Sequence, residues 1–433
     1  MDITGTTILL FVVFFILLGL SVPISISILI SSFVTALATL PFEQVVFIIM
    51  QKMNSGIESF NLLAVPLFIL AGNIMNNGGI ARRLVNFAQA FVGRIPGSLA
   101  HANILGNMFF GALSGSAVAA SAAIGGTLYP IQEEEEYDPA FATSVNIASA
   151  PTGLLIPPTT AFIVYSTVAG GVSISALFMA GYIPGILMGL STMIIAYLYA
   201  KKNNYSVSEK TSVKEKVKAT LDALPSLLLI VIVIGGIVGG VFTATEGAGI
   251  AVLYCFILSL IYRSLTMKSM VKILIDSART SGIILFLISA SSAMSWVMAY
   301  SGIPNAISQA MLSITSSANV IFFLMIVILL VVGTFMDITP ALLIFTPIFL
   351  PIAESFGMHP VHFGVVLVMA MCIGTMTPPV GSVLFVSCGI SNLSIESVFK
   401  RLIPYLAAVT VILLFVTYIP ALSLTIPQWL NLL

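Results

Sequence analysis

Two stretches of this sequence, NIASAPTGLLIPPTTAF (residues 146–162) and VLVMAMCIGTMTPPVGSVLF (residues 366–385), decide the fold. Each is an apolar run that a glycine and a Pro-Pro pair interrupt. The interrupting residues are Gly153, Pro157 and Pro158 in the first run and Gly374, Pro378 and Pro379 in the second. Proline removes a backbone donor and clashes with the preceding helical turn. Each run therefore predicts a helix that is broken near its centre.

The composition places both runs in a membrane protein. Of the 433 residues, 59% are hydrophobic and only 7% are charged, and the mean hydropathy is +1.13. A soluble domain carries roughly 25% charged residues, so a soluble enzyme or a disordered protein is excluded. The 16 basic and 16 acidic residues balance, which leaves no basic surface for nucleic acid. The cysteines, Cys255, Cys372 and Cys388, lack CxxC spacing and predict neither a disulfide framework nor a zinc site.

Long apolar runs predict an all-α polytopic fold, because a spanning helix needs about 20 apolar residues. The runs cover residues 6–40, 59–76, 139–170, 184–200, 224–242, 246–262, 281–300, 361–390 and 403–421. We split the first run into two helices at Pro23. The amphipathic segments 43–57 and 264–279 are predicted to lie along the membrane surface. The polar segment 201–223 is predicted to be a cytoplasmic linker.

An internal repeat relates the two halves of the chain. An ungapped shift of 221 residues aligns Gly153 with Gly374 and each Pro-Pro pair with the other, among a dozen identities between residues 120 and 174. Hydropathy alone does not align glycines and prolines, so we interpret the match as a duplication. The predicted units are residues 1–200, the linker 201–223 and residues 224–433.

The distribution of basic residues predicts that the two units cross the membrane in opposite directions. Lys and Arg accumulate on the cytoplasmic side. Arg82, Arg83 and Arg94 follow the span at 59–76, whereas the matching loop at 301–318 has no basic residue. Five crossings per unit place the linker inside and both termini in the periplasm. Inverted repeats with interrupted helices are typical of secondary transporters.

Each unit also contains a region that predicts a re-entrant hairpin. The first covers about 99–131 and is rich in small residues, with Ser114-Gly115-Ser116 near its tip. The second covers about 319–352, with VGTFMDITP (332–340) at its tip. The 221-residue shift aligns Asp337 with Ser116. A carboxylate deep in an apolar run is costly unless it is paired or faces water. Cation coordination, helix capping and proton transfer all remain open for Asp337.

The hairpin tips and the helix breaks predict two related ion sites, because hard cations bind carbonyl, hydroxyl, amide and carboxylate oxygens. The first comprises Ser114, Gly115, Ser116, Asn146, Ser149 and Gly153, and the second Gly333, Thr334, Asp337, Gly374, Met376 and Thr377. The half-helices that begin near Ala117 and Ile338 direct positive dipole ends to the midplane, which favours an anionic substrate. The candidate substrate-binding residues are Ser116, Ala117, Thr152, Pro157, Pro158, Thr159, Ile338, Pro378 and Pro379.

Four motifs resemble a known family. SGSAVAASAAIG (114–125), NIASAPTGLLIPPTTAFIVYS (146–166), MDITPALLIFTPIFLP (336–351) and GTMTPPVGSVLF (374–385) resemble the large membrane subunit of TRAP transporters, of the DctM type. The resemblance covers essentially the whole chain. Within the family the sequence looks closest to sialic-acid transporters, although these motifs do not encode the substrate.

The resemblance implies sodium-driven import of an organic acid, of the sialic acid or C4-dicarboxylate type, across the bacterial inner membrane. It implies two partners, a periplasmic substrate-binding protein and a separate small four-helix membrane subunit of the DctQ type. It implies an elevator mechanism, with a scaffold at about 6–55, 184–262 and 403–421. Sodium ions are the only cofactor it implies. Their ligands would be Ser114, Ser116, Asn146, Gly153, Asp337, Gly374 and Thr377.

Two other classes of function compete with a carrier. A channel could be built from the same broken helices. An intramembrane protease would need a pair such as Ser114 or Ser116 with His101, but the sequence has no GxSG, HExxH or GxGD pattern. We therefore expect a transporter and not an enzyme.

Overall fold

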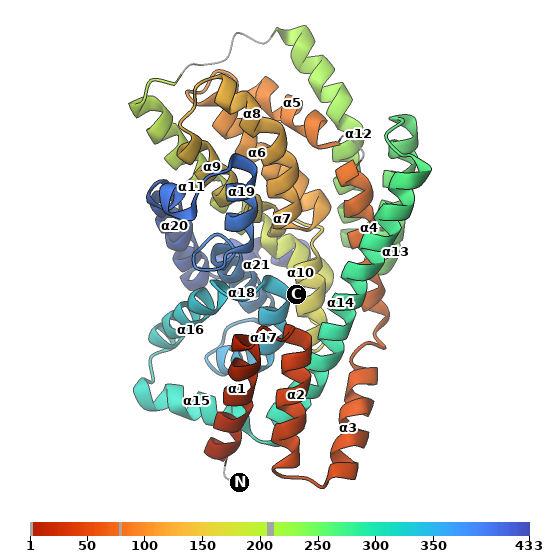
Figure 1. The fold of residues 1–433 in the computed structure, drawn as a ribbon, viewed down its shortest axis with the longest axis vertical. Helices are drawn as coiled ribbons and strands as arrows, with labels where there is room; N and C mark the ends of the chain where they lie inside the picture. Colours follow the sequence, from red (N-terminus) through yellow and green to blue (C-terminus); the bar gives the residue numbers. More distant parts are fainter. Residues whose placement is uncertain (1–2, 78–79, 206–211) are drawn as a thin grey trace.

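A computed structural model describes residues 3–77, 80–205 and 212–433, and this part of the chain contains helices and no strands (Figure 1). The first half contains α1 (Ile3–Gly19), α2 (Ile24–Leu37), α3 (Phe42–Ser55), η1 (Phe60–Leu63), α4 (Ala64–Asn77), α5 (Ile80–Val92), α6 (Ser98–Ser114), α7 (Ala117–Ala120), η2 (Ser121–Gly125), α8 (Gly126–Glu134), α9 (Pro139–Ser149), η3 (Ala150–Leu154), α10 (Thr160–Val168) and α11 (Ile174–Lys202).

The second half contains α12 (Val213–Val238), α13 (Ala244–Ile261), α14 (Met267–Tyr300), α15 (Ile303–Ile314), α16 (Ala318–Gly333), α17 (Ile338–Ser355), α18 (Pro360–Gly374), α19 (Ser382–Ser391), α20 (Ile395–Tyr418) and α21 (Ala421–Trp429). Helices α11 and α12 extend into both ends of the predicted linker. The middle of that linker, residues 206–211, lies outside the described residues.

The two halves repeat one order of elements. The shift of 221 residues that aligns the sequences also carries the starts of α7, α9 and α11 onto the starts of α17, α18 and α20. In Figure 1, α6 and α8 lie in the upper part of the view and α16 and α17 lie lower, and the two hairpins approach from opposite ends. This arrangement is the inverted repeat that the sequence predicted.

One pair of equivalent segments differs between the halves. Helix α3 is bent by 63° from the segment that contains α4, whereas the corresponding part of the second half is the single 34-residue helix α14. Residues 264–279 were predicted to lie along the membrane surface. Most of this segment is continuous with the span at 281–300, because residues 267–300 form the one helix α14.

Both predicted broken helices are interrupted where proline and glycine stand. Helix α9 ends at Ser149 and passes into the 3-10 turn η3, and α10 begins only at Thr160. Helix α18 ends at Gly374 and α19 begins at Ser382. Both Pro-Pro bonds are cis. The hairpins likewise turn at the predicted tips, between α6 and α7 and between α16 and α17.

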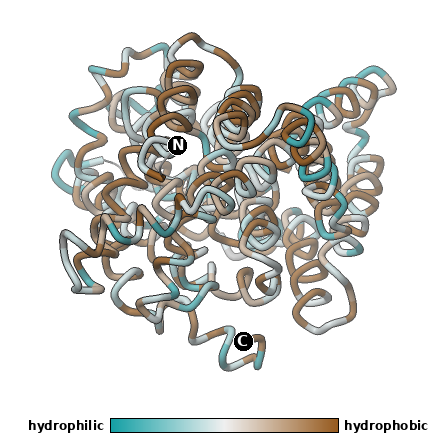
Figure 2. Tube along the Cα trace, turned by 90° about the horizontal axis from the view of Figure 1, so that it is seen from below, coloured by the Kyte–Doolittle hydropathy of each residue, from teal (hydrophilic) through white to brown (hydrophobic). Residues whose placement is uncertain are grey.

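The surface suits a lipid environment. Among the described residues, six helices are long and apolar enough to cross a membrane, and the count reaches eight if each of two bent helix pairs forms one span. Large hydrophobic side chains such as Val231, Leu253 and Phe415 are more than half exposed. Hydrophobic residues dominate the helices in Figure 2, and hydrophilic residues gather at turns and helix ends. The chain is therefore a multi-pass membrane protein.

The helices form two groups, which we call the outer bundle and the hairpin bundle. The outer bundle contains α1–α4 and α12–α14, and α13 packs closely on α4. The hairpin bundle contains α6–α11 and α16–α21, in which α11 packs on α6, α18, α20 and α21, and α20 packs on α9 and α18. Helices α11 and α20, which contain the segments 184–200 and 403–421 of the expected scaffold, therefore pack with the broken helices. Helices α5 and α15 lie between the bundles and contact both.

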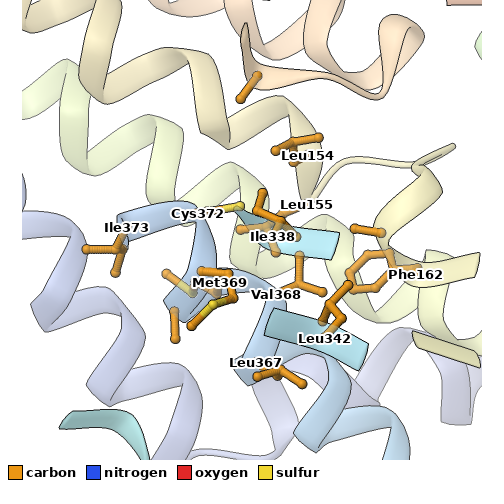
Figure 3. Packing of buried hydrophobic residues seen from close by; sticks show 14 of the residues in the cluster. Leu154, Leu155, Phe162, Ile338, Leu342, Leu367, Val368, Met369, Cys372 and Ile373 are labelled. Carbon is orange, nitrogen blue, oxygen red and sulfur yellow. The ribbon is translucent and has the colours of Figure 1, made fainter. Parts of the chain in front are cut away.

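A buried apolar core joins the two repeats inside the hairpin bundle (Figure 3). Side chains of η3 and α10, including Leu154 and Phe162, meet Ile338 and Leu342 of α17 and the flank of α18. Each of these side chains is less than a tenth exposed. Burial of this kind contributes about 25 cal/mol per Å² of apolar surface removed from water, or less where the alternative environment is lipid. The core fixes the hairpin tips relative to the helix breaks.

Candidate transport site

A cavity of about 290 Å³ lies where the two hairpin tips meet. The tips contribute Ser114, Gly115, Ser116 and Ala117 from the first repeat and Asp337, Ile338 and Thr339 from the second. The starts of α10 and α19 add Thr160 and Ser382, and Thr375 follows α18. Among the described residues that line this space, Asp337 is the only ionisable one, so we call it the Asp337 cavity.

Ser116 and Asp337 occupy equivalent positions in the two repeats. Ser116 precedes α7 and its hydroxyl accepts a hydrogen bond from the Ala119 N–H at 3.2 Å, as an N-cap does. Asp337 precedes α17 in the same way, and the backbone N–H of Ile338 lies beside its carboxylate, but no side-chain capping bond of good geometry forms. Its side chain is exposed to the cavity. Capping alone therefore does not account for this carboxylate, which retains acceptor capacity toward the cavity.

The opposite wall of the Asp337 cavity comes from the outer bundle. Helix α4 contributes Asn73 and α14 contributes Thr280, and the Asn73 Nδ2 donates to the Ser277 Oγ at 2.8 Å. Gly72 brings α4 close to the hairpin tip, because a Cβ there would lie 2.8 Å from the Ser114 carbonyl oxygen. The cavity thus lies between the two bundles and contains residues of both.

Sequence reasoning missed a group of polar residues that line the Asp337 cavity: Asn73, Thr160, Thr280, Thr339, Thr375 and Ser382. Asn73 and Thr280 come from separate spans, and only tertiary packing brings them to the hairpin tips. The available signal was weak. Asn73 is one polar residue inside the apolar run at 59–76, where hydropathy alone does not reveal which neighbour it faces.

Three of the predicted ion-site glycines serve close backbone packing. A Cβ on Gly153 would lie 2.5 Å from the Gly111 Cα, and a Cβ on Gly374 would lie 2.4 Å from the Gly333 Cα. Real Cβ atoms do not approach that closely, so each hairpin leg requires glycine where it crosses a helix break. Gly153, Gly333 and Gly374 do not line the Asp337 cavity.

Two other predicted ion ligands belong to a buried polar network beside the cavity. The Asn107 Nδ2 donates to the Asn146 Oδ1 at 3.0 Å and to the Ser149 Oγ at 2.8 Å. The Asn146 Nδ2 donates to the Ser387 Oγ at 3.1 Å. These bonds tie α6, α9 and α19 together. Asn146 and Ser149 therefore bond to protein partners, and the structure does not bring them to the Asp337 carboxylate.

The second helix break, between α18 and α19, is also held by hydrogen bonds to protein groups. The Thr334 carbonyl accepts hydrogen bonds from the N–H groups of Val380 and Gly381, at 3.0 and 3.3 Å. The Thr377 hydroxyl donates to the Ile373 carbonyl at 2.8 Å, and Met376 is fully buried. Thr334, Met376 and Thr377 thus hold the tip of the second hairpin against the break and do not line the cavity.

Of the predicted substrate-binding residues, Ser116, Ala117 and Ile338 line the Asp337 cavity. The others are outside its lining: Thr152, Pro157, Pro158, Thr159, Pro378 and Pro379. The Thr159 hydroxyl accepts from the Ala161 N–H at 3.2 Å and caps α10. The cavity is thus a space with one carboxylate and several hydroxyl groups. Such a space suits a cation together with a small solute that accepts hydrogen bonds.

Comparisons with known proteins show the family of the chain and do not test the site residues. The family described as "Tripartite ATP-independent periplasmic transporter, DctM component" matches residues 11–422. The chain is 52% identical to the uncharacterized protein YgiK of Salmonella typhimurium, with 97% of each chain covered. It is 34% identical to the C4-dicarboxylate TRAP transporter large permease of Rhodobacter capsulatus, over 96% of this chain and 97% of that one. The relatives whose names state a function are transporter permeases and not enzymes.

Two further comparisons bear on the substrate and on the partners. Identity to the sialic acid TRAP transporter large permease of Vibrio cholerae is 35%, with 87% and 88% coverage, so sequence similarity does not single out sialic acid. Identity to the isethionate TRAP transporter permease DctMQ of Oleidesulfovibrio alaskensis is 38%. This match covers 96% of the present chain but only 65% of the relative, whose name joins two components.

A solved structure resembles the fold. The YdaH transporter of Alcanivorax borkumensis superposes with a TM-score of 0.59 over 90% of this chain and 89% of the other, at 13% identity. At that identity the likeness concerns the fold alone.

Proposed function

This chain belongs to the DctM component family of tripartite ATP-independent periplasmic transporters, and on that premise we propose that it imports an organic acid in symport with sodium ions. The observation that supports the proposal is the Asp337 cavity. A solvent-accessible carboxylate favours a cation, and the hydroxyl groups of Ser114, Ser116 and Thr280 are suited to an anionic solute. If the cation and the anionic solute bind in the same cavity, their movement across the membrane would be coupled.

Sodium is energetically adequate for this role. One positive charge that crosses a potential of 100 mV releases about 2.3 kcal/mol. Two ions that cross with a monoanionic solute move one net positive charge and gain about 2.3 kcal/mol from the potential, and a tenfold sodium gradient adds about 1.4 kcal/mol for each ion. Tenfold solute accumulation costs about 1.4 kcal/mol, so roughly three decades of accumulation would need no nucleotide.

The position of the cavity supports an elevator mechanism. Both hairpin tips and both breaks belong to the hairpin bundle, whereas Asn73 and Thr280 belong to the outer bundle. Movement of the hairpin bundle along α4 and α14 would expose the same cavity on the two sides in turn. We propose the outer bundle as the scaffold and the hairpin bundle, now including α11 and α20, as the moving part.

Two partners complete the proposed system. We propose that a small membrane subunit of the DctQ type packs on this chain, since one relative's name combines the two components. A periplasmic binding protein would deliver the solute. The chain would lie in the bacterial inner membrane. The substrate class is an organic acid, of which sialic acid and C4-dicarboxylates are candidates.

The test is uptake into proteoliposomes that contain this chain, the small subunit and the binding protein. Labelled succinate, isethionate and N-acetylneuraminate are offered with an inward sodium gradient, a potassium gradient or none. We expect saturable uptake of at least one acid that the sodium gradient raises more than tenfold. Asp337→Asn should raise the half-saturating sodium concentration at least tenfold, because the cation loses the only charged ligand that we place in the cavity.

Asp222→Asn, which replaces an exposed carboxylate of α12 outside both cavities, serves as the matched control and should leave the sodium dependence unchanged. Uptake that is indifferent to sodium would refute the coupling. Solute conductance without accumulation would instead indicate a channel. An Asp337→Asn variant with the parent's sodium affinity would remove Asp337 from the ion site.

A further inference from the structure

A second polar cavity, of about 380 Å³, lies between the same two bundles. We call it the serine cavity, because hydroxyl side chains from three segments line it. Helix α14 contributes three serines, the segment that precedes α4 contributes a serine and an asparagine, and the end of α10 contributes one more: Ser291, Ser292, Ser295, Ser59, Asn61 and Ser166. Its volume falls within the range of about 300–1,000 Å³ that small-molecule sites occupy.

The serine cavity follows the Asp337 cavity along the same helices. On α14, Ile284 lines the Asp337 cavity and Ile288 lines the serine cavity. On α17 the corresponding residues are Ile338 and Leu343. Four residues of helix advance by about 6 Å, so about one to two helical turns separate the two spaces. An apolar layer that includes Ile284, Ile288 and Leu343 divides them.

One buried hydroxyl group in the serine cavity has no hydrogen-bond partner within the part of the chain that the structure describes. Ser291 is only 3% exposed, and its Oγ makes no hydrogen bond with the described residues. By contrast, the Ser166 hydroxyl and its neighbour Thr167 donate to backbone carbonyls. A buried polar group without a partner is unfavourable. A ligand oxygen that reached Ser291 would remove that penalty, and this is the observation that distinguishes the cavity from an ordinary small-residue helix contact.

The cavity is open at one end. Ser59 and Asn61 at its mouth are exposed. An adjoining polar groove of about 240 Å³ shares Asn61, Ser166 and Gly171 with it and extends to the turn between α12 and α13. The distribution of basic residues predicts this end of α14 on the periplasmic side. A solute from that side would therefore meet the serine cavity before the apolar layer.

We propose that the serine cavity is a second binding site for the transported organic acid, occupied before the solute reaches the Asp337 cavity. The described residues that line it carry no ionisable side chain. Recognition would therefore rest on hydrogen bonds from hydroxyl and amide groups to carboxylate, sulfonate or hydroxyl oxygens of the solute. Weak binding of this kind permits release to the next site. The inference rests on the proposed function for the identity of the solute.

Trp296 provides a local reporter for this site. It follows Ser295 directly, stands one helical turn beyond Ser292 and stacks on Tyr300 with ring centroids 5.1 Å apart. The only other tryptophan is Trp429, and Trp429→Phe removes it. The full chain with its small subunit is titrated with succinate, isethionate and N-acetylneuraminate. We expect a saturable change in Trp296 emission with the acid that the transport assay selects.

Variants assign that signal to the serine cavity. Thr280→Leu narrows the Asp337 cavity and should abolish uptake while it leaves the Trp296 response in place. Ser291→Ala should raise the half-saturating concentration of the Trp296 response at least fivefold, and Ser295→Leu, at a half-buried position, should do the same by filling space. Ser281→Ala is the matched control. Ser281 is another buried serine of α14 whose hydroxyl has no partner among the described residues, but it lines neither cavity.

The inference is overturned if no acid changes Trp296 emission, if Ser291→Ala and Ser295→Leu respond as Ser281→Ala does, or if Thr280→Leu abolishes the response. Its failure is distinct from failure of the proposed function. Sodium-driven uptake without any Trp296 response removes the second site alone, whereas a Trp296 response without sodium-driven uptake removes the coupling alone.

Discussion

At the residue scale, Asp138 connects three helices at one end of the hairpin bundle. Its Oδ2 accepts from the Tyr199 hydroxyl at 2.7 Å and from the Arg401 Nε at 3.1 Å, and its Oδ1 accepts from the Ala140 N–H at 3.0 Å. Burial alone would raise the pKa of this carboxyl. The hydrogen bonds and the Arg401 charge outweigh burial and hold the pKa of Asp138 below its ordinary value of 3.8.

Replacing Asp138 should weaken this junction in a pH-dependent way. A lowered pKa in the folded state means that ionised Asp138 stabilises the protein above pH ~4 and that the contribution fades as pH falls through the folded-state pKa. Asp138→Asn keeps an N-cap side chain but loses the charge. We expect a loss of about 1 kcal/mol at pH 7, the order expected of a charged hydrogen bond at a partly exposed site.

The measurement is thermal unfolding of the purified protein in detergent between pH 7 and pH 3. The gap in melting temperature between the parent and Asp138→Asn should narrow toward the acid end. Tyr199→Phe, which removes one donor, should show a smaller gap of the same sign. A gap that stays constant with pH would show that the charge of Asp138 contributes nothing to stability.

At the element scale, glycines set how closely each hairpin crosses its broken helix. The Gly111–Gly153 contact in the first repeat and the Gly333–Gly374 contact in the second bring backbone against backbone. In a membrane, helices gain little from burying apolar surface against each other, and close packing at small residues takes its place. These contacts position the tips on either side of the Asp337 cavity.

Gly374→Ala should therefore alter the Asp337 cavity, although residue 374 does not line it. The added methyl group would lie 2.4 Å from the Gly333 Cα, so α16 or the break must shift. We expect a loss of about 1–3 kcal/mol in stability, the usual cost of overpacking, and at least a tenfold loss of uptake. Gly249→Ala in α13 is the matched control, because a Cβ there has no neighbour within 4 Å.

Thermal unfolding and proteoliposome uptake of the two variants provide the comparison. Gly249→Ala should keep the parent's stability or gain a few tenths of a kcal/mol, since alanine favours helix over glycine. If Gly374→Ala unfolds and transports like Gly249→Ala, the glycine contact is not required.

A second element-scale feature is the bend between α3 and α4, which α14 lacks. Gly56 stands at the C-terminal end of α3, and a Cβ on it would lie 2.4 Å from the Ser292 Cβ of α14. The Ser289 hydroxyl donates to the Met53 carbonyl at 2.9 Å. The glycine thus lets α3 end against α14, close to the serine cavity. Position 277, which the repeat aligns with Gly56, is a serine and continues the helix.

At the scale of the whole molecule, the inverted repeat makes a prediction about the two membrane faces. Arg94 and Ser313 are both exposed and lie in the corresponding regions of the two repeats. Arg94→Cys should react with an impermeant maleimide from the cytoplasmic face only, and Ser313→Cys from the periplasmic face only. The native cysteines are free and buried, so the parent should stay unlabelled.

Maleimide labelling of each variant in intact cells and in inverted vesicles tests this prediction. Lys202→Cys, an exposed position at the end of α11, provides a cytoplasmic reference. Labelling of positions 94 and 313 from one and the same face would contradict the inverted repeat and, with it, the assignment of the serine cavity to the periplasmic side.

The sequence by itself determined the membrane class, the repeat, the hairpin tips and the two helix breaks, because these depend on composition and on the local chemistry of proline and glycine. It also identified Ser116 and Asp337 as an equivalent pair. Only the tertiary structure decided which helices pack together, and it places α11 and α20 in the hairpin bundle. It also places Asn73 and Thr280 in the wall of the Asp337 cavity and Asn146 outside that wall. The physical reason is that uniformly apolar helices carry little periodic pattern. Their neighbours are set by close packing at glycines and by buried hydrogen bonds between residues far apart in sequence.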